Sequence, residues 1–378
     1  MKIAVNTRFL LSGKMEGFGW YTYEITKRLV EQHPEHEFIF FFDRPYDPKF
    51  IFASNVTPIV LNPPARHPVL FIYWFEFAVR RALKKVKADV FFSPDGYLSL
   101  LSNTPQISVI HDINFEHFPK DLPWSARAYL RYFFPLFAKK ATQIITVSEY
   151  SKQDIVETYK ISPQKITAIW NGASDVFVPI NEAEQSSIKA KYSYNKPYFL
   201  FVGSLHPRKN VARLIEAFVL FKQKTKAEHQ LVIVGSSLWK NKAFQLKVSD
   251  QIKSEIHFTG HLNINELSKL MAAAEALTFV PYFEGFGIPL IEAMKCGTAI
   301  LSGNRTSLPE VAGDAAIYCD PFSVIDIAQK LELISTDEPL RAHLKASGLE
   351  RGKKFNWDNS AMQVWQVIEA VLKNKAAN

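Results

Sequence analysis

The stretch YFLFVGSLHPRKNVARLIEAFVLF, residues 198–221, decides the fold class. Its first part is an unbroken run of apolar and aromatic residues, which is typical of a parallel strand covered on both faces. From Val211 onward, apolar residues recur at the three- and four-residue spacing of a helix that covers a sheet. Because glycine and proline separate the two parts, the stretch predicts a strand, a loop and a helix in that order.

The same order recurs along the chain of 378 residues. Short β-branched or aromatic runs predict strands at KIAVNTR, EFIFFF, DVFFSP, ISVIHD and QIITVS in the first half, and at YFLFVGS, QLVIVGS, EIHFTG, ALTFVPY and AILSG in the second. Strands that alternate with helices on this scale predict an α/β protein built from two Rossmann-like, doubly wound domains.

The chain is too long for one ordinary hydrophobic core, so we expect two domains. Residues 178–197 are polar, weakly periodic and bounded by prolines, and they predict a linker at residues 181–196. We therefore expect a first domain at residues 1–180 and a second at residues 197–357, which face each other across a central cleft. Ligands of such sheets bind at the carboxyl ends of the strands.

Composition argues against several classes of protein. Hydrophobic residues make up 47% of the chain and charged residues 22%, which is ordinary for a globular protein. No uninterrupted apolar stretch of about 18 residues is present, so we expect no membrane-spanning helix. The N-terminal run contains Arg8 and lacks a small-residue cleavage site, which argues against a signal peptide. Two cysteines, Cys296 and Cys319, suit the reducing cytoplasm and offer neither a disulfide framework nor a metal cluster.

Two cations stand directly before a predicted helix. Arg208 and Lys209 precede the helical pattern that begins at Val211. Cations at a helix N-terminus oppose the helix dipole, so they destabilise the protein unless an anion binds. A diphosphate would neutralise them and also accept from the free N–H groups of the helix end. The alternative is a solvated loop with two surface charges.

The stretch PYFEGFGIPLIEAMKCG, residues 281–297, places Glu284 in a loop and Glu292 at the start of a helix. Pro289 suits the opening of that helix and Gly297 its end. Ionised carboxylates only accept hydrogen bonds, so they suit sugar hydroxyls. The helix dipole alone would explain a glutamate at position 292, whereas no comparable local feature explains the glutamate at position 284. Together with the two cations, the pattern fits the hydroxyls, diphosphate and hydroxyls of a nucleotide-sugar.

Two weaker candidates lie in the first half. Gly17 and Gly19 stand between the first strand and the first helix, but Thr22 occupies the position where a dinucleotide fingerprint needs glycine or alanine. A dehydrogenase is therefore not expected, and a looser glycine turn near a ligand remains open. His111 closes the strand ISVIHD, and a lone histidine is more often structural than catalytic.

Residues 70–87 and 126–140 each combine aromatic with basic side chains. Such helices lie on anionic bilayers, or they cover a sheet and turn a basic face to solvent, and both interpretations stay open. The net charge of +8 suits nucleic acid, anionic lipid or a phosphorylated ligand. Because no RNA-binding signature or zinc-finger spacing is present, we expect no nucleic-acid partner.

These motifs, in their order and spacing, resemble the retaining glycosyltransferases of family 4, which have the two-domain GT-B fold. The resemblance rests on GFGWYTYEI, VIHDINFEHFP, TVSEYSKQDIVETYKISPQKITAIWNGASDVF, FVGSLHPRKNVARLIEAF, FTGHLNINELSKLMAAAEALTFVPYFEGFGIPLIEAMKCGTAILSG and SLPEVAGDAAIYCDP. The fifth segment holds two glutamates separated by seven residues. The resemblance also implies that residues 358–378 form a terminal helix, which crosses back and packs on the first domain.

Carried over by position, the resemblance implies a catalytic pair, His111 and Glu284, that contacts the transferred sugar from the two domains. It further implies a donor-binding set, namely Gly19, Arg208, Lys209, Leu262, Phe286, Gly287, Ile288 and Glu292. In that set Arg208 and Lys209 would neutralise the diphosphate, and Glu292 would accept from the ribose. The main chain at Phe286, Gly287 and Ile288 would hold phosphate and sugar, Gly19 would leave room for phosphate, and Leu262 would lie near the base.

The resemblance implies a retaining hexosyltransferase that uses a nucleotide-diphosphate sugar. Because no acidic metal-binding motif is evident, we expect no cofactor or metal, and we expect a cytoplasmic location from the two cysteines. We expect mannose from a GDP-sugar donor first and a UDP-sugar donor next, with a glycan or lipid-linked glycan as acceptor. Peripheral contact with the inner face of an anionic membrane stays open. One alternative is a non-catalytic protein that binds nucleotide-sugar or a membrane surface. A glycoside hydrolase would also use two carboxylates, but it leaves Arg208 and Lys209 unexplained.

Overall fold

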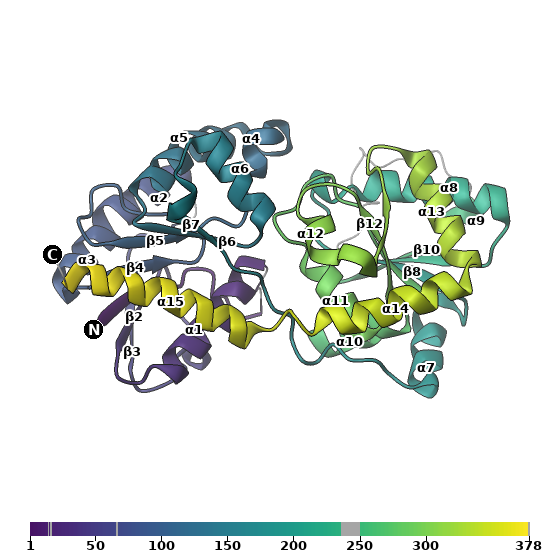
Figure 1. The fold of residues 1–378 in the computed structure, drawn as a ribbon, viewed down its shortest axis with the longest axis horizontal. Coiled ribbons are helices and arrows are strands. Elements are labelled where there is room, and N and C mark those ends of the chain that lie inside the picture. The colour runs from purple at the N-terminus through teal and green to yellow at the C-terminus, as the bar shows by residue number, and fades with distance from the viewer. Residues whose placement is uncertain (14, 16, 66, 236–249, 377–378) are drawn as a thin grey trace. The chain divides into compact units, whose positions relative to one another are not determined.

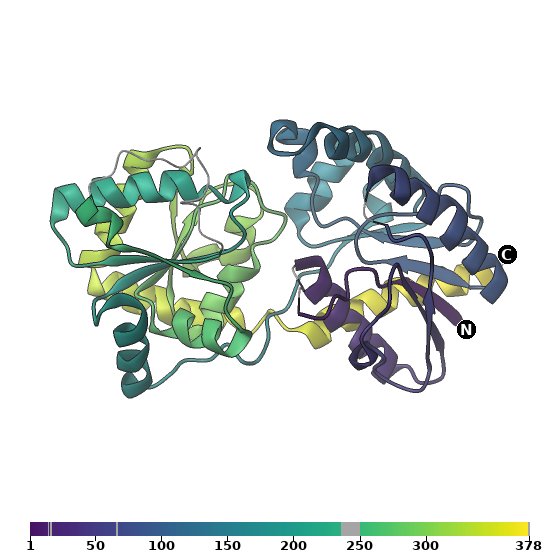
Figure 2. The ribbon, with the colours of Figure 1, turned by 180° about the vertical axis from the view of Figure 1, so that it is seen from behind.

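The computed structural model describes residues 1–13, 15, 17–65, 67–235 and 250–376. The chain forms two compact units (Figure 1). Unit 1 comprises Met1–Asn171 and Trp357–Asn378, and unit 2 comprises Gly172–Asn356. Each unit is a parallel sheet with helices on both faces, as Figure 2 shows from behind, so the predicted α/β architecture is confirmed.

The sheet of unit 1 has the strand order β3-β2-β1-β4-β5-β6-β7, and all neighbouring strands are parallel. Its strands are β1 (Lys2–Asn6), β2 (Glu37–Phe42), β3 (Val56–Val60), β4 (Val90–Ser93), β5 (Gln106–Val109), β6 (Gln143–Thr146) and β7 (Ile166–Ala168). The register places Val5 between Phe40 and Phe92, and all three side chains are buried. Strands that are apolar on both faces follow from this burial under two layers of helices.

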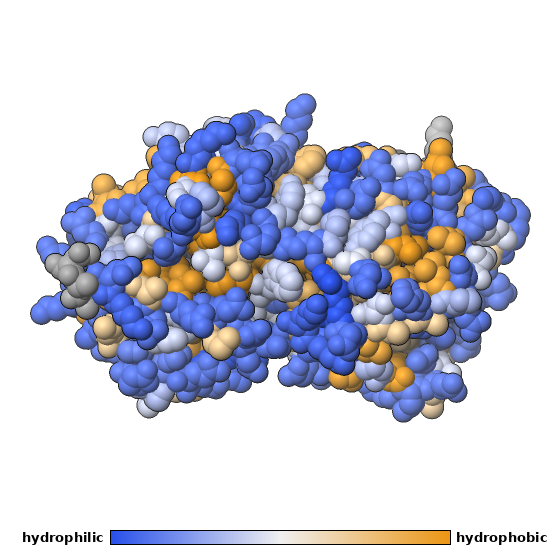
Figure 3. All heavy atoms as spheres, viewed as in Figure 1, coloured by the Kyte–Doolittle hydropathy of each residue, from blue (hydrophilic) through white to orange (hydrophobic). Residues whose placement is uncertain are grey.

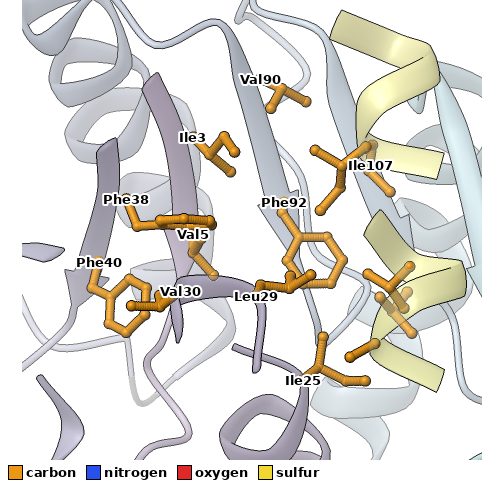
Figure 4. Packing of buried hydrophobic residues seen from close by; sticks show 14 of the residues in the cluster. Ile3, Val5, Ile25, Leu29, Val30, Phe38, Phe40, Val90, Phe92 and Ile107 are labelled. Carbon is orange, nitrogen blue, oxygen red and sulfur yellow. The ribbon is translucent and has the colours of Figure 1, made fainter. Parts of the chain in front are cut away.

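One face of this sheet is covered by α1 (Gly17–Gln32) and α15 (Trp357–Ala376). Figure 4 shows the core on that side, where Ile25 and Leu29 of α1 join Val5 and Phe92. Because α15 also contributes buried residues at three- and four-residue spacing to the same core, the terminal helix packs back on unit 1, as expected.

The opposite face is covered by a helical segment and by two further long helices. These elements are α2 (Pro68–Tyr73), the π-helical turn η2 (Trp74–Val79), α3 (Arg80–Val86), α5 (Trp124–Lys140) and α6 (Glu149–Tyr159). Their inward residues, among them Trp74 and Phe137, are fully buried. Short elements complete the unit, namely η1 (Pro48–Phe50), α4 (Asn114–His117), η3 (Pro119–Asp121) and η4 (Pro163–Lys165).

The sheet of unit 2 has the order β10-β9-β8-β11-β12-β13 and is also parallel. Its strands are β8 (Tyr198–Val202), β9 (Gln230–Val234), β10 (Ile256–Gly260), β11 (Ala276–Phe279), β12 (Ala299–Gly303) and β13 (Ile317–Cys319). Its helices are α7 (Glu182–Ser193), η5 (Pro207–Lys209), α8 (Val211–Thr225), α9 (Asp250–Lys253), α10 (Ile264–Ala273), α11 (Ile288–Cys296), α12 (Leu308–Ala312), η8 (Gly313–Ala315), α13 (Val324–Thr336) and α14 (Glu338–Gly352).

The structure corrects the expected domain boundary. Residues 181–196 are not a linker, because most of them form α7, which packs on α10 within unit 2. The Asn181 side chain caps this helix by accepting from the backbone N–H of Glu184 at 2.9 Å. Lys269 of α10 also donates to the Glu184 carboxylate at 3.0 Å. Unit 2 accordingly begins at Gly172 and not at residue 197.

On the face drawn in Figure 3, the surface of each unit is mostly hydrophilic, with hydrophobic side chains interspersed. Among the described residues, no helix has the length and apolar character needed to cross a membrane.

Candidate active site

The strand order of unit 2 creates one place where a ligand is expected. From β8 the chain moves outward to β9 and β10, and it then returns to β11 on the other side of β8. The order therefore reverses between β8 and β11. Loops diverge there at the carboxyl ends of the strands, and doubly wound sheets bind ligands in the resulting crevice. Arg208 and Lys209 follow β8 and Glu284 follows β11, so three predicted site residues meet at this point.

Glu284 pairs with both predicted cations. Its Oε1 atom lies 3.0 Å from Nη1 of Arg208, and it also forms an ion pair with Nζ of Lys209. Glu284 is only 6% exposed, so water screens these pairs weakly. The sequence predicts that the two cations need a bound anion. In the structure that anion is the chain's own carboxylate, and the cluster still carries one excess positive charge.

The loop that carries the cations is tied to the loop after β11. Asn210 adopts a left-handed conformation at φ 62°, and its side-chain amide donates to the carbonyls of Val280 at 2.9 Å and Pro321 at 2.6 Å. The backbone N–H of Tyr282 donates to the carbonyl of Arg208 at 3.1 Å. These bonds fix both loops before any ligand binds, so the cluster is preorganised.

The N-terminus of α11 adds a backbone donor next to this cluster. Gly287 precedes the helix with φ 97°, and a Cβ atom there would lie 3.0 Å from Cδ2 of Leu308. Only glycine fits this turn without strain. Phe286 is buried. Ile288 is the first residue of α11 and Pro289 is the second. Within the first turn of α11, Pro289 has no N–H and Leu290 donates to the carbonyl of Gly287 at 2.9 Å. The N–H of Ile288 is therefore the donor that this helix end offers to a negative ligand.

Glu292 lies one turn further along α11 and is half-buried. Burial raises the pKa of its carboxyl to about 7. A ligand hydroxyl that donates to the ionised form would lower this pKa again. Leu262 is half-buried and lies between β10 and α10, so it belongs to the same edge of the sheet.

His111 lies in unit 1, directly after β5. Its Nε2 atom is 2.8 Å from the carbonyl oxygen of Pro94, and its ring makes edge contacts with Phe18 and Tyr21. Burial lowers the pKa of the imidazole, although the bond to Pro94 opposes this shift. Because a carbonyl only accepts, Nε2 carries the proton of the neutral ring and Nδ1 keeps its lone pair. Nδ1 is thus suited to accept from a hydroxyl.

Gly19 lies in the first turn of α1. A Cβ atom there would lie 2.7 Å from the carbonyl oxygen of Phe9, which side chains essentially never tolerate. The loop after β1 therefore requires glycine at this position irrespective of any ligand.

The sequence interpretation missed a buried ion pair at the corresponding point of the other sheet. Arg8 follows β1 and Asp95 follows β4, where the strand order of unit 1 reverses. Nε of Arg8 lies 2.5 Å from Oδ2 of Asp95, and Asn6 donates to the other carboxylate oxygen at 2.8 Å. The pair holds the turn whose Pro94 carbonyl accepts from His111. Arg8 ends the predicted strand KIAVNTR and Asp95 directly follows the predicted strand DVFFSP. The rule that ligands bind at the carboxyl ends of strands could therefore have identified both residues.

The predicted site residues thus fall into two groups. Unit 2 holds the residues at the carboxyl edge of its sheet, namely Arg208, Lys209, Leu262, Glu284, Phe286, Gly287, Ile288 and Glu292. Unit 1 holds His111 and Gly19. Among the described residues, no group of three or more histidine, cysteine, aspartate or glutamate side chains is arranged to hold a metal ion.

Family models match both halves of the chain. The model of glycosyl transferases group 1 matches residues 183–351, and the model of Glycosyltransferase Family 4 matches residues 15–175. Together they span the sheet of unit 2 and every strand of the unit 1 sheet except β1, and they define a glycosyltransferase. The chain belongs to this family of group 1 and family 4 glycosyltransferases, and it is a hexosyltransferase with the GT-B fold.

Individual proteins agree with this assignment. The O-antigen chain mannosyltransferase B of Escherichia coli is 27% identical over 361 residues, which cover 92% of this chain and 94% of the relative. The sucrose-phosphate synthase structure from Thermosynechococcus elongatus superposes with a TM-score of 0.79 at 18% identity, with 99% of each chain covered. The Anabaena protein HepE in complex with UDP-glucose gives a TM-score of 0.75 at 17% identity, covering 98% of this chain and all (100%) of HepE. At these identities the two structures support the fold alone.

Proposed function

We propose that the protein transfers mannose, with retention of configuration, from a nucleotide-diphosphate sugar to a glycan or lipid-linked glycan. The observation that carries this proposal is the cluster of Arg208, Lys209 and Glu284 at the reversal point of the unit 2 sheet. It combines charge for a diphosphate with an acceptor for sugar hydroxyls. Mannose is supported by the relative named O-antigen chain mannosyltransferase B.

In the proposed reaction the diphosphate lies against Arg208, Lys209 and the N-terminus of α11. The bond between the sugar anomeric carbon and the leaving phosphate oxygen breaks, and the acceptor hydroxyl forms the new bond on the same face. The acceptor proton leaves with the departing phosphate. Both cations stabilise the negative charge that develops on this phosphate, and they do so from positions fixed in advance.

The remaining residues bind the two ends of the donor. Glu284 and Nδ1 of His111 accept from hydroxyls of the transferred sugar. Glu292 accepts from the ribose, and Leu262 lies near the base. We propose GDP as the nucleotide, with UDP as the competing choice because the fold neighbour HepE was crystallised with UDP-glucose.

We further propose that transfer requires no metal ion or cofactor, because in the proposed site two side-chain cations and a helix N-terminus would neutralise the diphosphate. The test is turnover after EDTA treatment. Full activity supports the proposal, whereas loss of activity that magnesium or manganese restores refutes it.

The proposal also includes a cytoplasmic location and contact with the inner face of an anionic membrane. The two stretches of aromatic and basic residues, 70–87 and 126–140, support membrane contact.

The experiment that tests the donor assignment is a thermal-shift screen of the purified chain against GDP, UDP, ADP and their sugar conjugates. A ligand at 100 times its Kd adds about 2.7 kcal/mol to the free energy of unfolding, which is readily seen as a raised Tm. A selective shift with one nucleotide identifies the base, and transfer from its sugar conjugate is then measured. The absence of a shift with every nucleotide refutes the donor site.

A further inference from the structure

One helical segment of unit 1 carries a stripe that the proposed transfer reaction does not use. The elements α2, η2 and α3 run without a break through residues 68–86. Val69, Tyr73, Phe77, Arg81 and Lys85 are spaced four apart along it, which makes them neighbours on one side of an α-helix. Across the π-helical turn η2 the last four of them still line one groove. All five are exposed, and the first three are 66%, 50% and 53% exposed. The stripe therefore has an apolar end and a cationic end.

A groove of about 320 Å³ lies beside this stripe. Its wall on one side is residues 59–61, at the end of the edge strand β3, and its wall on the other is the helical segment. Tyr73, Phe77, Arg81 and Lys85 all line it, and the rings of Tyr73 and Phe77 lie 5.3 Å apart. The groove thus joins apolar walls to two cationic side chains.

The positive charge of this segment is not balanced locally. Its cations are Arg80, Arg81, Lys84, Lys85 and Lys87, and within the described part of the chain none of them forms an ion pair with a carboxylate. The one acidic residue among residues 67–87 is Glu76. Glu76 is buried, and its carboxylate accepts from the backbone N–H groups of Leu100 at 2.8 Å and Leu101 at 2.9 Å. The outer face is therefore open to an anion.

The outward stripe of this segment is not part of the hydrophobic core of unit 1. The inward side of the same segment buries Trp74, Phe75, Val79 and Leu83 against the sheet. Exposed apolar side chains that form a continuous patch indicate a binding surface and not a packing requirement. The neighbouring helix α5, which contacts α2, also exposes an aromatic side chain, Trp124, at 74%.

We propose that this groove binds an anionic phospholipid and docks unit 1 on a membrane surface. An acyl chain packs along Val69, Tyr73 and Phe77, while the phosphate headgroup meets Arg81 and Lys85. Nucleic acid matches the cations but offers no long apolar chain for the other end of the stripe. The inference rests on the proposed membrane contact and gives it a site, and it is independent of sugar transfer.

The test is flotation of the full chain with vesicles of phosphatidylcholine alone or with 30 mol% phosphatidylglycerol. We expect binding to the anionic vesicles that falls as salt rises, because surface charges are screened. Each basic residue near an anionic surface contributes to binding, so R81A/K85A should lower the partition coefficient about 30-fold. F77S should lower it as well while leaving the salt dependence intact. Inorganic phosphate at 10 mM should not displace the protein.

The matched control is K353A/K354A, which removes two exposed lysines from unit 2 and should partition like the wild type. Circular dichroism and Tm of all variants establish that they are folded. If the wild type fails to bind anionic vesicles, the proposed membrane contact is refuted. If it binds but R81A/K85A binds equally well, or if phosphate alone or RNA releases it completely, the groove is not the lipid site.

Discussion

Substitution of Glu284 by glutamine should separate nucleotide affinity from catalysis. Without ligand, the Glu284 carboxylate occupies both Arg208 and Lys209, the groups that the donor diphosphate is proposed to contact. The amide keeps the shape of the side chain but removes its charge. The diphosphate then no longer competes with an internal anion, whereas the hydroxyl of the transferred sugar loses its ionised acceptor.

The expected magnitudes have opposite signs. A hydrogen bond to a charged group contributes about 1.5–3 kcal/mol, and about 1.4 kcal/mol corresponds to a factor of ten. At the lower end, the affinity of E284Q for the free nucleotide diphosphate should rise about tenfold. The value of kcat/KM should instead fall about 100-fold, as for removal of one transition-state contact. Free E284Q should also be less stable by about 3 kcal/mol, near the lower limit for a broken buried pair, because the Arg208 side chain is 21% exposed.

Isothermal titration with GDP and UDP measures the affinity, and nucleotide release measures turnover. The matched control is E292Q, which changes a carboxylate on α11 that is not paired with the two cations and should leave the affinity for the diphosphate portion unraised. Saturating nucleotide should restore most of the stability lost in E284Q, since it supplies the missing negative charge. A parallel loss of nucleotide affinity and kcat/KM in E284Q would refute the competition, and would mean that Glu284 orients the cations for the diphosphate.

Three further outcomes are expected. Because burial raises the pKa of Glu292 to about 7 from 4.5, its contribution to stability is complete below about pH 4.5 and is lost as pH rises through 7. Because donor binding needs the ionised form of Glu292, KM for the donor should fall as pH rises toward 7, and E292Q should remove this dependence. A wild-type KM that stays constant from pH 5.5 to 8 contradicts the assignment. D95N leaves Arg8 as a buried charge without a counter-ion and should lower the free energy of unfolding by about 3–5 kcal/mol in urea titrations, so a loss below about 1 kcal/mol excludes a structural role for the pair. G287A forces a left-handed alanine against Leu308 and should cost about 1–3 kcal/mol of stability, together with a higher KM for the donor, whereas wild-type values for both contradict the strained turn.

Local sequence patterns were sufficient for every strand that lies inside a sheet. The strands missed from sequence, β3, β7 and β13, are all at sheet edges. Two of them are only three residues long, and β3 contains Pro58, which an edge strand tolerates because one side of its backbone is unpaired. The helix α7 was missed because among its twelve residues only Ser193 is buried, so almost no apolar periodicity marks it.

The sequence predicted which residues form the site better than it predicted how those residues interact. The local sequence indicates that Arg208 and Lys209 need an anion and that no neighbouring feature explains a glutamate at position 284. It does not indicate that these three side chains form ion pairs with one another. Their pairing depends on β8 and β11 being neighbours, and the two strands are separated along the chain by β9, β10 and the helices between them. Strand order follows from how successive crossovers pack on the sheet and not from local propensity. The ends of the strands predicted from sequence therefore identify the residues that can meet at a reversal of strand order, and Arg8 and Asp95 are a second example. Which of these residues form ion pairs with one another depends on the topology of the sheet.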